Sequence, residues 1–548
     1  MSQQQNTESW FDYIVVGTGP AGSVMTKKLS DGNRHTVLTL EAGSNDSRSE
    51  FVRNSKFAIP ILLFEKYAPQ FYIPGHGTAQ KYASGRTFPW TGGRLLGGGS
   101  SVNNQQYVRP SAHVMKKWED LLGPIWSPTE ETRHFKELEK YNGWTSNPSA
   151  RGDQGRLDIR QTQINPTNVA RKFVTAISQA TYLPEVLDYN DPNTPIGPFL
   201  RYQLYQTPSG VRASADSAFL SSDIMTPEGK GVNGRKLDVS FNSTVTKIIF
   251  DGKRAIGVEF IKNGVCYHAF ARKKVVLSAG ISSVPILMQS GIGDQNQLNQ
   301  LGISVIAHNP NVGKHYADHP AVTATFKINP NDHVSPLDDP NSLYAGGAFL
   351  PNPTPDSDQN TRAIQMFAQA QPLTGNRDTK HMMTIGAILL QPKSRGHASI
   401  QNKDPLKITL GDQGYLTNSA DLETFMYTYK VYIKKIAENI AKIDPSYQLV
   451  TPSMDVINDD QKLAQFIQDN MGHGFHPQSM NRMDPNPEKG VVDARGHVHG
   501  VENLVVADDT IIPFTVDGNT SAPAFLIGAT IAEQLLKEAA RNNQHETR

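Results

Sequence analysis

One short glycine-rich motif near the amino end, GTGPAG at residues 17–22, most constrains how this chain can fold. It follows an apolar run, FDYIVV at residues 11–16, and precedes residues 23–29, which have helix-compatible spacing. A second apolar run, TVLTL at residues 36–40, ends at Glu41. Strand, glycine turn, helix and strand in about 30 residues form a βαβ unit. Because the two strands of such a unit are parallel and buried, the motif predicts an α/β lobe.

The glycines of this turn fit a dinucleotide-binding fingerprint. Gly17 permits the tight turn, Gly19 lets the backbone approach a pyrophosphate, and Gly22 allows close packing of helix on strand. The phosphates would lie on the free N–H groups at the start of the helix. Glu41 stands where a carboxylate accepts hydrogen bonds from ribose hydroxyls, which argues against a 2′-phosphate and hence against NADP. The turn alone does not choose between NAD and FAD.

Composition excludes several classes of protein. The 548 residues carry 53 Lys plus Arg and 52 Asp plus Glu, a formal net charge of +1, so charge indicates neither nucleic acid nor an anionic membrane as a partner. The one cysteine, Cys266, excludes an internal disulfide and any multi-cysteine metal site. The polar opening and the lack of a run of about 18 apolar residues predict a cytoplasmic protein without membrane segments.

The remaining chain divides into two kinds of segment. Alternating runs at residues 239–250 and 254–260 predict an antiparallel hairpin, and KVVLS at residues 274–278 predicts a buried strand. The segment at residues 502–537 reads as a strand, a loop and an alanine-rich helix.

Residues 315–465 predict a second lobe with an antiparallel sheet. Its expected strands include residues 321–326 and 397–400, and a long helix is expected over residues 419–441. Residues 50–90, rich in proline and aromatic side chains, predict a long covering loop.

Three further motifs are similar to those of the glucose–methanol–choline (GMC) family of flavin oxidoreductases. GRLLGGGSSVN at residues 93–103 is similar to the first family signature. SAGISSVPILMQSGIG at residues 278–293 is similar to the second, although the expected Ser-Pro pair reads Ser283-Val284. VHGVENLVVADDTIIPFTVDGNTSAP at residues 498–523 matches best. Shorter family-like stretches lie at residues 311–313, 318–320 and 393–396.

The resemblance implies a fold that is α/β plus α+β, with a Rossmann-like FAD-binding lobe interleaved with a substrate lobe built on an antiparallel sheet. The FAD-binding domain would comprise residues 9–48, 91–160, 205–312 and 466–548. The substrate-binding domain and covering loop would comprise residues 49–90, 161–204 and 313–465.

The resemblance also implies FAD as the cofactor. The glycine-dense segment would pass close to the flavin and the pyrophosphate, because only glycine lets main chain pack on a flat ring. Val102 stands where some family members carry a histidine that binds FAD covalently, so the resemblance implies non-covalent FAD. The implied cofactor-binding residues are Gly17, Gly19, Pro20, Ala21, Gly22, Glu41, Ala42, Arg94, Gly97, Gly98, Gly99, Ser100, Asn103, Val245, Asp508, Asp509, Asn519, Thr520 and Ala522.

The same resemblance implies a catalytic pair. His476, in the segment GHGFHP, corresponds to the active-site base of the family, and Asn519 corresponds to its partner. An imidazole has a reference pKa near 6.5 and can remove the hydroxyl proton of an alcohol as hydride leaves for flavin N5. An amide cannot take up that proton, but it can donate a hydrogen bond to the developing alkoxide. The neighbouring His473, His497 and His499 are expected to be structural, and no metal is expected.

The resemblance therefore implies FAD-dependent oxidation of a small-molecule alcohol, with electrons passing to O2 or to an artificial or protein acceptor. Three alternatives stay open: a hydroxynitrile lyase on the same fold, a fatty-acid photodecarboxylase, and a NAD-linked dehydrogenase, the last disfavoured because the flavin-type motifs fit FAD better. Aromatic residues within 64–72 and the strand at residues 362–370 are candidates for the wall of the substrate pocket. The sequence indicates neither the alcohol nor the oligomeric state.

Overall fold

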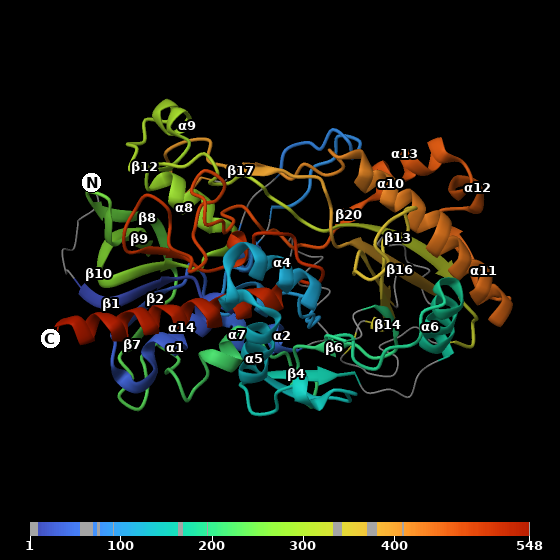
Figure 1. The fold of residues 1–548 in the computed structure, drawn as a ribbon, viewed down its shortest axis with the longest axis horizontal. Coiled ribbons are helices and arrows are strands. Elements are labelled where there is room, and N and C mark those ends of the chain that lie inside the picture. The colour runs from blue at the N-terminus through green and yellow to red at the C-terminus, as the bar shows by residue number, and fades with distance from the viewer. Residues whose placement is uncertain are drawn as a thin grey trace.

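The computed structural model describes residues 9–54, 69–73, 77–90, 92–162, 168–193, 196–332, 342, 344–369, 381–407 and 410–546. These residues form two lobes that lie side by side along the long axis, each built around a seven-stranded sheet (Figure 1). Both chain ends lie at the outer side of the first lobe. The expected combination of an α/β lobe with an antiparallel-sheet lobe is confirmed.

The first lobe has a mixed sheet. Its strands, in spatial order, are β7 (Leu237–Ser240), β2 (Val37–Leu40), β1 (Ser9–Val16), β10 (Val265–Leu277), β9 (Arg254–Lys262) and β8 (Ser243–Asp251), with β21 (Leu504–Val506) beside β10. Strands β7, β2, β1, β10 and β21 are parallel to their neighbours, whereas β10, β9 and β8 pair antiparallel. The parallel part is thus assembled from the beginning, the middle and the end of the chain.

The predicted βαβ unit forms at the centre of this sheet. All four residues of β2 and the last four of β1 are buried, as expected for parallel strands covered on both faces. Helix α1 (Pro20–Ser30) begins at a proline that follows Gly19, a favoured first helical residue. The long helix α14 (Ser521–Glu546) packs directly on α1 (Figure 1), and a Cβ at Gly528 would lie 2.6 Å from the Ala21 carbonyl oxygen.

One predicted strand is divided in the structure. The alternating run at residues 239–250 was expected to form one arm of a hairpin, but Leu237–Ser240 is β7, which pairs parallel with β2. Asn242 has a positive φ of 53° and turns the chain, so that only Ser243–Asp251 continues as β8 against β9. Asparagine tolerates this left-handed conformation better than most residues, and alternation alone does not reveal it.

The second lobe has a sheet whose neighbouring strands are all antiparallel. Its strands, in spatial order, are β19 (Gln448–Thr451), β13 (Pro320–Lys327), β16 (Met382–Leu389), β15 (Ile364–Gln369), β14 (Tyr344–Leu350) and β5 (Gly197–Phe199), with β20 (Gly472–His473) beside β13. The expected strand at residues 321–326 is confirmed as part of β13. The expected strand at residues 397–400 is not part of this sheet: it forms β17 (His397–Ser399), which pairs with β18 (Leu410–Asp412) as a separate ribbon.

Helices cover one side of the second sheet (Figure 1): α6 (Asn168–Thr181), α10 (Ser419–Tyr427), α11 (Lys434–Ile443), α12 (Met454–Ile457) and α13 (Asp460–Asn470). The single helix expected over residues 419–441 is interrupted by a π-helical stretch at Thr428–Ile433. The Thr428 hydroxyl donates to the Thr424 carbonyl oxygen at 2.8 Å, a contact that bends helices. None of the helices within the described ranges is long and apolar enough to cross a membrane.

The remaining elements of the first lobe surround its sheet. They are α2 (Glu50–Arg53), α4 (Ala112–Leu122), α5 (Pro128–Leu138), α7 (Ala215–Phe219), α8 (Ser283–Gln289), α9 (Gln295–Gln300), the pair β11 (Ile292–Gly293) and β12 (Ala307–His308), and the three-stranded sheet of β3 (Glu139–Asn142), β4 (Leu157–Gln161) and β6 (Gln203–Leu204).

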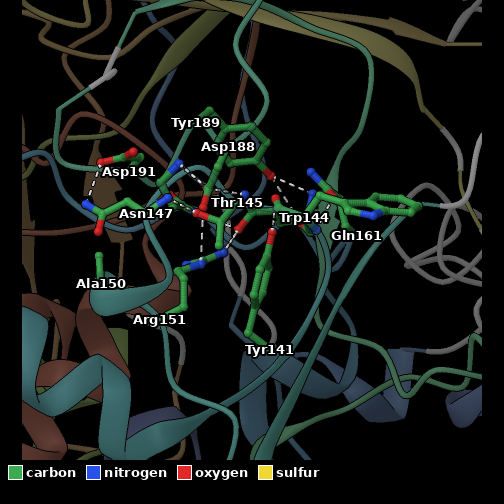
Figure 2. Close-up of polar contacts among 12 residues, drawn as sticks. Tyr141, Trp144, Thr145, Asn147, Ala150, Arg151, Gln161, Asp188, Tyr189 and Asp191 are labelled. Atoms are coloured by element: carbon green, nitrogen blue, oxygen red, sulfur yellow. Dashed lines mark hydrogen bonds and ion pairs between the residues drawn. The ribbon is translucent and has the colours of Figure 1, made fainter.

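A buried polar network lies beside that three-stranded sheet (Figure 2). One of its ion pairs joins Arg151 Nε to Asp188 Oδ2 at 3.3 Å. From the same segment, Asn190 Oδ1 accepts a hydrogen bond from the Arg109 backbone at 2.8 Å, and Asn190 Nδ2 donates to the Tyr107 carbonyl oxygen at 3.1 Å. The network therefore fixes the backbone that leads away from the glycine-dense segment.

Candidate active site

The glycine turn between β1 and α1 has the conformation that each of its glycines was expected to require. Gly17 has φ +98°, and a Cβ there would lie 2.4 Å from the Ser278 carbonyl oxygen. A Cβ at Gly22 would lie 2.1 Å from the Gly17 carbonyl oxygen, so helix and turn are in direct contact. A Cβ at Gly19, by contrast, would meet no described atom within 4 Å. Gly19 is thus the point where the backbone is open to a ligand.

Glu41 holds this turn closed. Its Oε2 accepts hydrogen bonds from the Thr18 backbone at 3.0 Å and the Thr18 hydroxyl at 2.5 Å, and its Oε1 accepts from the Gly43 backbone at 2.8 Å. Burial raises the pKa of Glu41, although these donors act in the opposite direction. A carboxylate has about four acceptor positions, so one remains for a ligand hydroxyl. Sequence reasoning missed Thr18, because the middle residue of the fingerprint carries no signal in the motif.

A second glycine turn lies against the first. Gly98–Ser101 forms a short 3-10 helix, and a Cβ at Gly98 would lie 2.7 Å from the Cα of Gly19. The Ser100 hydroxyl donates to the Gly97 carbonyl oxygen at 2.6 Å and accepts from the Ala215 backbone at 2.9 Å. These contacts make the segment an ordered loop.

One cavity of about 700 Å³ extends from these turns to His476. The lining residues from the predicted set are Gly17, Gly19, Pro20, Ala21, Glu41, Ala42, Arg94, Gly98, Gly99, Ser100, Asn103, Val245, Asp508, Asp509, Asn519 and Thr520. Gly22, Gly97 and Ala522 do not line it. Gly22 packs on Gly17, the Gly97 N–H donates to the hydroxyl of cavity-lining Thr18 at 3.3 Å, and Ala522 is buried in the first turn of α14. These three residues therefore lie behind the cavity lining.

Two acidic residues face the cavity near α8. Asp508 Oδ2 accepts from the Ser283 hydroxyl at 2.6 Å and from the Gly280 backbone at 2.9 Å. Asp509 Oδ1 is buried and has no hydrogen-bond partner among the described residues. Burial, and then the neighbouring charge of Asp508, raises the pKa of Asp509 well above its usual value.

His476 and Asn519, which stand 43 residues apart in the sequence, meet at the other end of the cavity. Asn519 Nδ2 lies 3.1 Å from His476 Nε2. Both residues line the cavity, and His476 is 7% exposed. Burial, and then the imidazole of His319, lowers the pKa of His476. The imidazole is therefore neutral near pH 7, with a nitrogen facing the cavity.

Two residues that sequence reasoning left without a role support this pair. Asp318 Oδ1 accepts from the backbones of His319 at 2.7 Å and His476 at 2.8 Å. His319 Nδ1 lies 2.9 Å from His476 Nδ1. The stretch at residues 318–320 stood out only as family-like, and no local pattern links it to a histidine about 160 residues later. Asp318 Oδ2 also lies 3.1 Å from His473 Nδ1, and His473 too lines the cavity.

Comparisons with known proteins agree with this geometry. The profile described as GMC oxidoreductase matches residues 11–321 with its amino-terminal part and residues 392–528 with its carboxy-terminal part. These two matches span most of the chain. The chain belongs to the GMC oxidoreductase family.

Relatives of this GMC oxidoreductase include the mitochondrial choline dehydrogenase of Homo sapiens, 28% identical with 95% of this chain and 89% of that protein covered. An oxygen-dependent choline dehydrogenase of Staphylococcus saprophyticus is also 28% identical, with 95% and 94% covered. Similar solved structures include pyridoxine 4-oxidase from Mesorbium loti (TM-score 0.83, 24% identical, 95% and 98% covered) and a formate oxidase variant from Aspergillus oryzae (TM-score 0.85, 19% identical, 97% and 99% covered). GMC oxidoreductases are FAD-binding flavoproteins that act on CH–OH donors, so this chain is an enzyme of that kind.

The cavity of this GMC oxidoreductase suits FAD on two grounds. At Gly19 and Gly99 an added Cβ would meet no described atom within 4 Å, which leaves backbone open to a diphosphate and a flat ring. The unpartnered Asp509 Oδ1 needs a donor, and a hydroxyl-bearing ribityl chain provides one. FAD would therefore extend from the turn at residues 17–22 towards His476.

Only some of the residues predicted for the substrate wall line the cavity. Phe367 and Gln369 of β15 face the cavity, whereas Ile364 and Met366 belong to the apolar core under the helices of the second lobe. Of the aromatic residues within 64–72, Tyr72 lines the cavity. Phe64 and Tyr67 lie outside the described residues.

One group of potential metal ligands occurs away from this cavity. Glu259, Cys266 and His268 on β9 and β10 bring their ligand atoms within 4.8 Å of one another. Lys247 Nζ lies 3.2 Å from Glu259 Oε2, so a lysine ammonium already neutralises the carboxylate that a cation would need.

Proposed function

We propose that this GMC oxidoreductase oxidises a small-molecule alcohol to an aldehyde or ketone, with His476 as the base and Asn519 as the hydrogen-bond donor. The observation that carries the proposal is the 3.1 Å contact between Asn519 Nδ2 and His476 Nε2 at the end of the cavity opposite the glycine turn. Choline dehydrogenases and pyridoxine 4-oxidase among the relatives and similar structures are named for alcohol substrates.

The residues of this chain would divide the work as follows. His476 is neutral because burial lowers its pKa, so its cavity-facing nitrogen can accept the hydroxyl proton. The Asn519 amide, which now donates to that nitrogen, can donate to the substrate oxygen as negative charge develops there. When bound, FAD supplies the acceptor for the hydride that leaves the carbon. In this proposal O2 or another acceptor would take up the electrons.

FAD binding in this proposal is non-covalent. Val102, at the position where some family members carry the attaching histidine, lines the cavity and has a side chain that cannot form such a bond. Denaturation with acid followed by filtration would release a non-covalent flavin into the filtrate. Flavin colour that stays with the denatured protein on the filter would overturn this part of the proposal.

An anaerobic panel of alcohols, followed by absorbance of the bound flavin, tests the reaction. We expect at least one alcohol to bleach the flavin, and peroxide formed after readmission of air identifies an oxidase. The variant His476→Ala should lower the rate of flavin reduction by about 10²-fold or more, the typical contribution of a general base. The matched control is His397→Ala, which changes an exposed histidine. Its bound flavin should be reduced at the normal rate.

Two kinds of result would contradict the proposed reaction. Near-normal reduction in His476→Ala would remove His476 from its role. A FAD-loaded enzyme that no alcohol reduces, but that splits cyanohydrins or releases carbon dioxide from fatty acids in light, would replace the proposal with the lyase or the photoenzyme.

A further inference from the structure

Four polar groups form a line behind the cavity, and they determine which nitrogen of His476 is free. The line begins at the Val516 carbonyl oxygen, 2.9 Å from His319 Nε2. It continues from His319 Nδ1 to His476 Nδ1 at 2.9 Å, and from His476 Nε2 to Asn519 Nδ2 at 3.1 Å. The two imidazole rings meet edge to face, 76° apart. Both histidines are at least nine-tenths buried.

The carbonyl end of the line fixes its direction. A carbonyl oxygen only accepts, so the 2.9 Å contact requires a proton on His319 Nε2. The alternative donor to that nitrogen, Gln478 Nε2, is farther away at 3.4 Å and also lies 3.3 Å from the His476 carbonyl oxygen. Burial lowers the pKa of His319, so its ring is neutral and carries one proton only. His319 Nδ1 is therefore an acceptor.

The proton on His319 also determines the donors and acceptors in the His319–His476 and His476–Asn519 contacts. Because His319 Nδ1 accepts, His476 Nδ1 must carry the proton, and a neutral His476 then has its lone pair on Nε2. The orientation of the Asn519 amide leads independently to the same position for the lone pair of His476. Gln365 Nε2 lies 3.3 Å from Asn519 Oδ1, so the Asn519 oxygen accepts there and its NH2 group donates to His476 Nε2.

We propose that His319 is a positioning residue that holds His476 in the tautomer with a proton on Nδ1 and a lone pair on Nε2, the nitrogen that faces Asn519 and the cavity. This inference rests on the proposed function, because the tautomer matters only if His476 is the base. An imidazole in the other tautomer would present an N–H to the substrate hydroxyl and could not remove its proton. In serine proteases, loss of the carboxylate that fixes a catalytic histidine in the same way lowers kcat by about 10⁴.

The test compares two variants in the FAD-loaded enzyme. His319→Leu removes the acceptor, whereas His319→Asn retains an acceptor on Cγ that can face His476 Nδ1. We expect His319→Leu to lower the rate of flavin reduction by about 10²-fold or more and His319→Asn to regain at least about tenfold of that loss. Equal losses in the two variants, with equal flavin content, would overturn the proposal.

A second readout does not depend on turnover. Long-range ¹H–¹⁵N spectra of enzyme labelled with ¹⁵N-histidine distinguish protonated from unprotonated ring nitrogens, and the His476 signals are those missing from His476→Gln. We expect one protonated Nδ1 and one unprotonated Nε2 in the wild type and in His319→Asn, and a mixture of tautomers in His319→Leu. An unprotonated Nδ1 in the wild type, or an unchanged spectrum in His319→Leu, would overturn the proposal. The expected spectra in an enzyme that no alcohol reduces would support the tautomer and refute the proposed reaction instead.

Discussion

Asp318 Oδ1 lies 2.8 Å from the backbone nitrogen of His476, although 158 positions separate the two residues. The same carboxylate accepts from the Tyr415 hydroxyl at 2.6 Å and lies 3.1 Å from His473 Nδ1. Burial alone would raise the pKa of Asp318, but these donors and the nearby histidines hold it below its usual range. Phe475, the residue before His476, has a positive φ of 59°. This backbone conformation is costly, and the hydrogen bond that the His476 backbone N–H donates to Asp318 can maintain it.

We therefore expect Asp318→Asn to destabilise the protein and to disturb the site. An amide would present an N–H to one side of a cluster of donors, so hydrogen bonds to a buried charge would be lost, at a cost of at least about 2 kcal/mol. Urea unfolding measures this loss, and the exposed Asp153, changed to asparagine, serves as the control. Unfolding curves that coincide for the two variants would contradict the role given to Asp318.

The lowered pKa of His476 predicts how the rate of flavin reduction depends on pH. Burial lowers its pKa, so the acidic limb of flavin reduction should lie below the ordinary histidine value of about 6.5. Asn519→Asp would place a carboxylate beside the ring, favour the imidazolium and move that limb to higher pH. Asn519→Leu removes the donor that favours the neutral imidazole without adding a charge, so it should move the limb in the same direction by a smaller amount. Profiles of kcat/KM against pH for the three enzymes check this, and an unmoved limb in Asn519→Asp would contradict it.

Substitution by alanine should have different effects at two glycines of the turn at residues 17–22. Gly22→Ala forces a Cβ to within 2.1 Å of the Gly17 carbonyl oxygen and should lower stability by about 1–3 kcal/mol. Gly19→Ala meets no described atom and has φ −62°, so the apoprotein should fold with normal stability but bind FAD more weakly. Thermal unfolding of apoprotein and titration with FAD separate the two effects. Normal FAD affinity in Gly19→Ala would show that the diphosphate does not pass there.

Glu131 on α5 predicts a loss of stability in alkaline solution. Burial raises its pKa to about 8, whereas the same side chain in the unfolded protein has a pKa of about 4.3, so between these pH values the folded state binds a proton that the unfolded state has lost. The stabilisation from this proton is complete below about pH 4.3 and is lost as pH rises through about 8.

Glu131→Gln cannot ionise, so its free energy of unfolding should increase relative to the wild type as pH rises. Urea unfolding at about pH 6 and about pH 8.5 measures the difference between the two proteins. The exposed Glu438, changed to glutamine, should show no such trend. If the difference between Glu131→Gln and the wild type were the same at both pH values, Glu131 would not be protonated in the folded state.

The features that were predictable from sequence depend on local patterns. The unit formed by β1, the glycine turn, α1 and β2 follows from apolar runs and glycine spacing. The pairing of His476 with Asn519 came from a family resemblance, because no spacing rule brings residues 43 positions apart together.

The features that were missed depend on the tertiary structure. The break between β7 and β8 depends on one left-handed asparagine, Asn242, within an otherwise regular alternation. The contact of His319 with His476 requires strand β13 of the second sheet to begin beside β20 and the segment that follows it. Neither feature has a periodicity that a single sequence displays.

The first lobe joins segments that are distant in the sequence, since β21 pairs with β10 and α14 packs on α1. The helix that carries Ser521 can therefore close over the first glycine turn only after residues 504–546 have left the ribosome. A nascent chain without residues 504–546 would lack Asp508, Asp509 and Asn519 and so would hold an unfinished pocket.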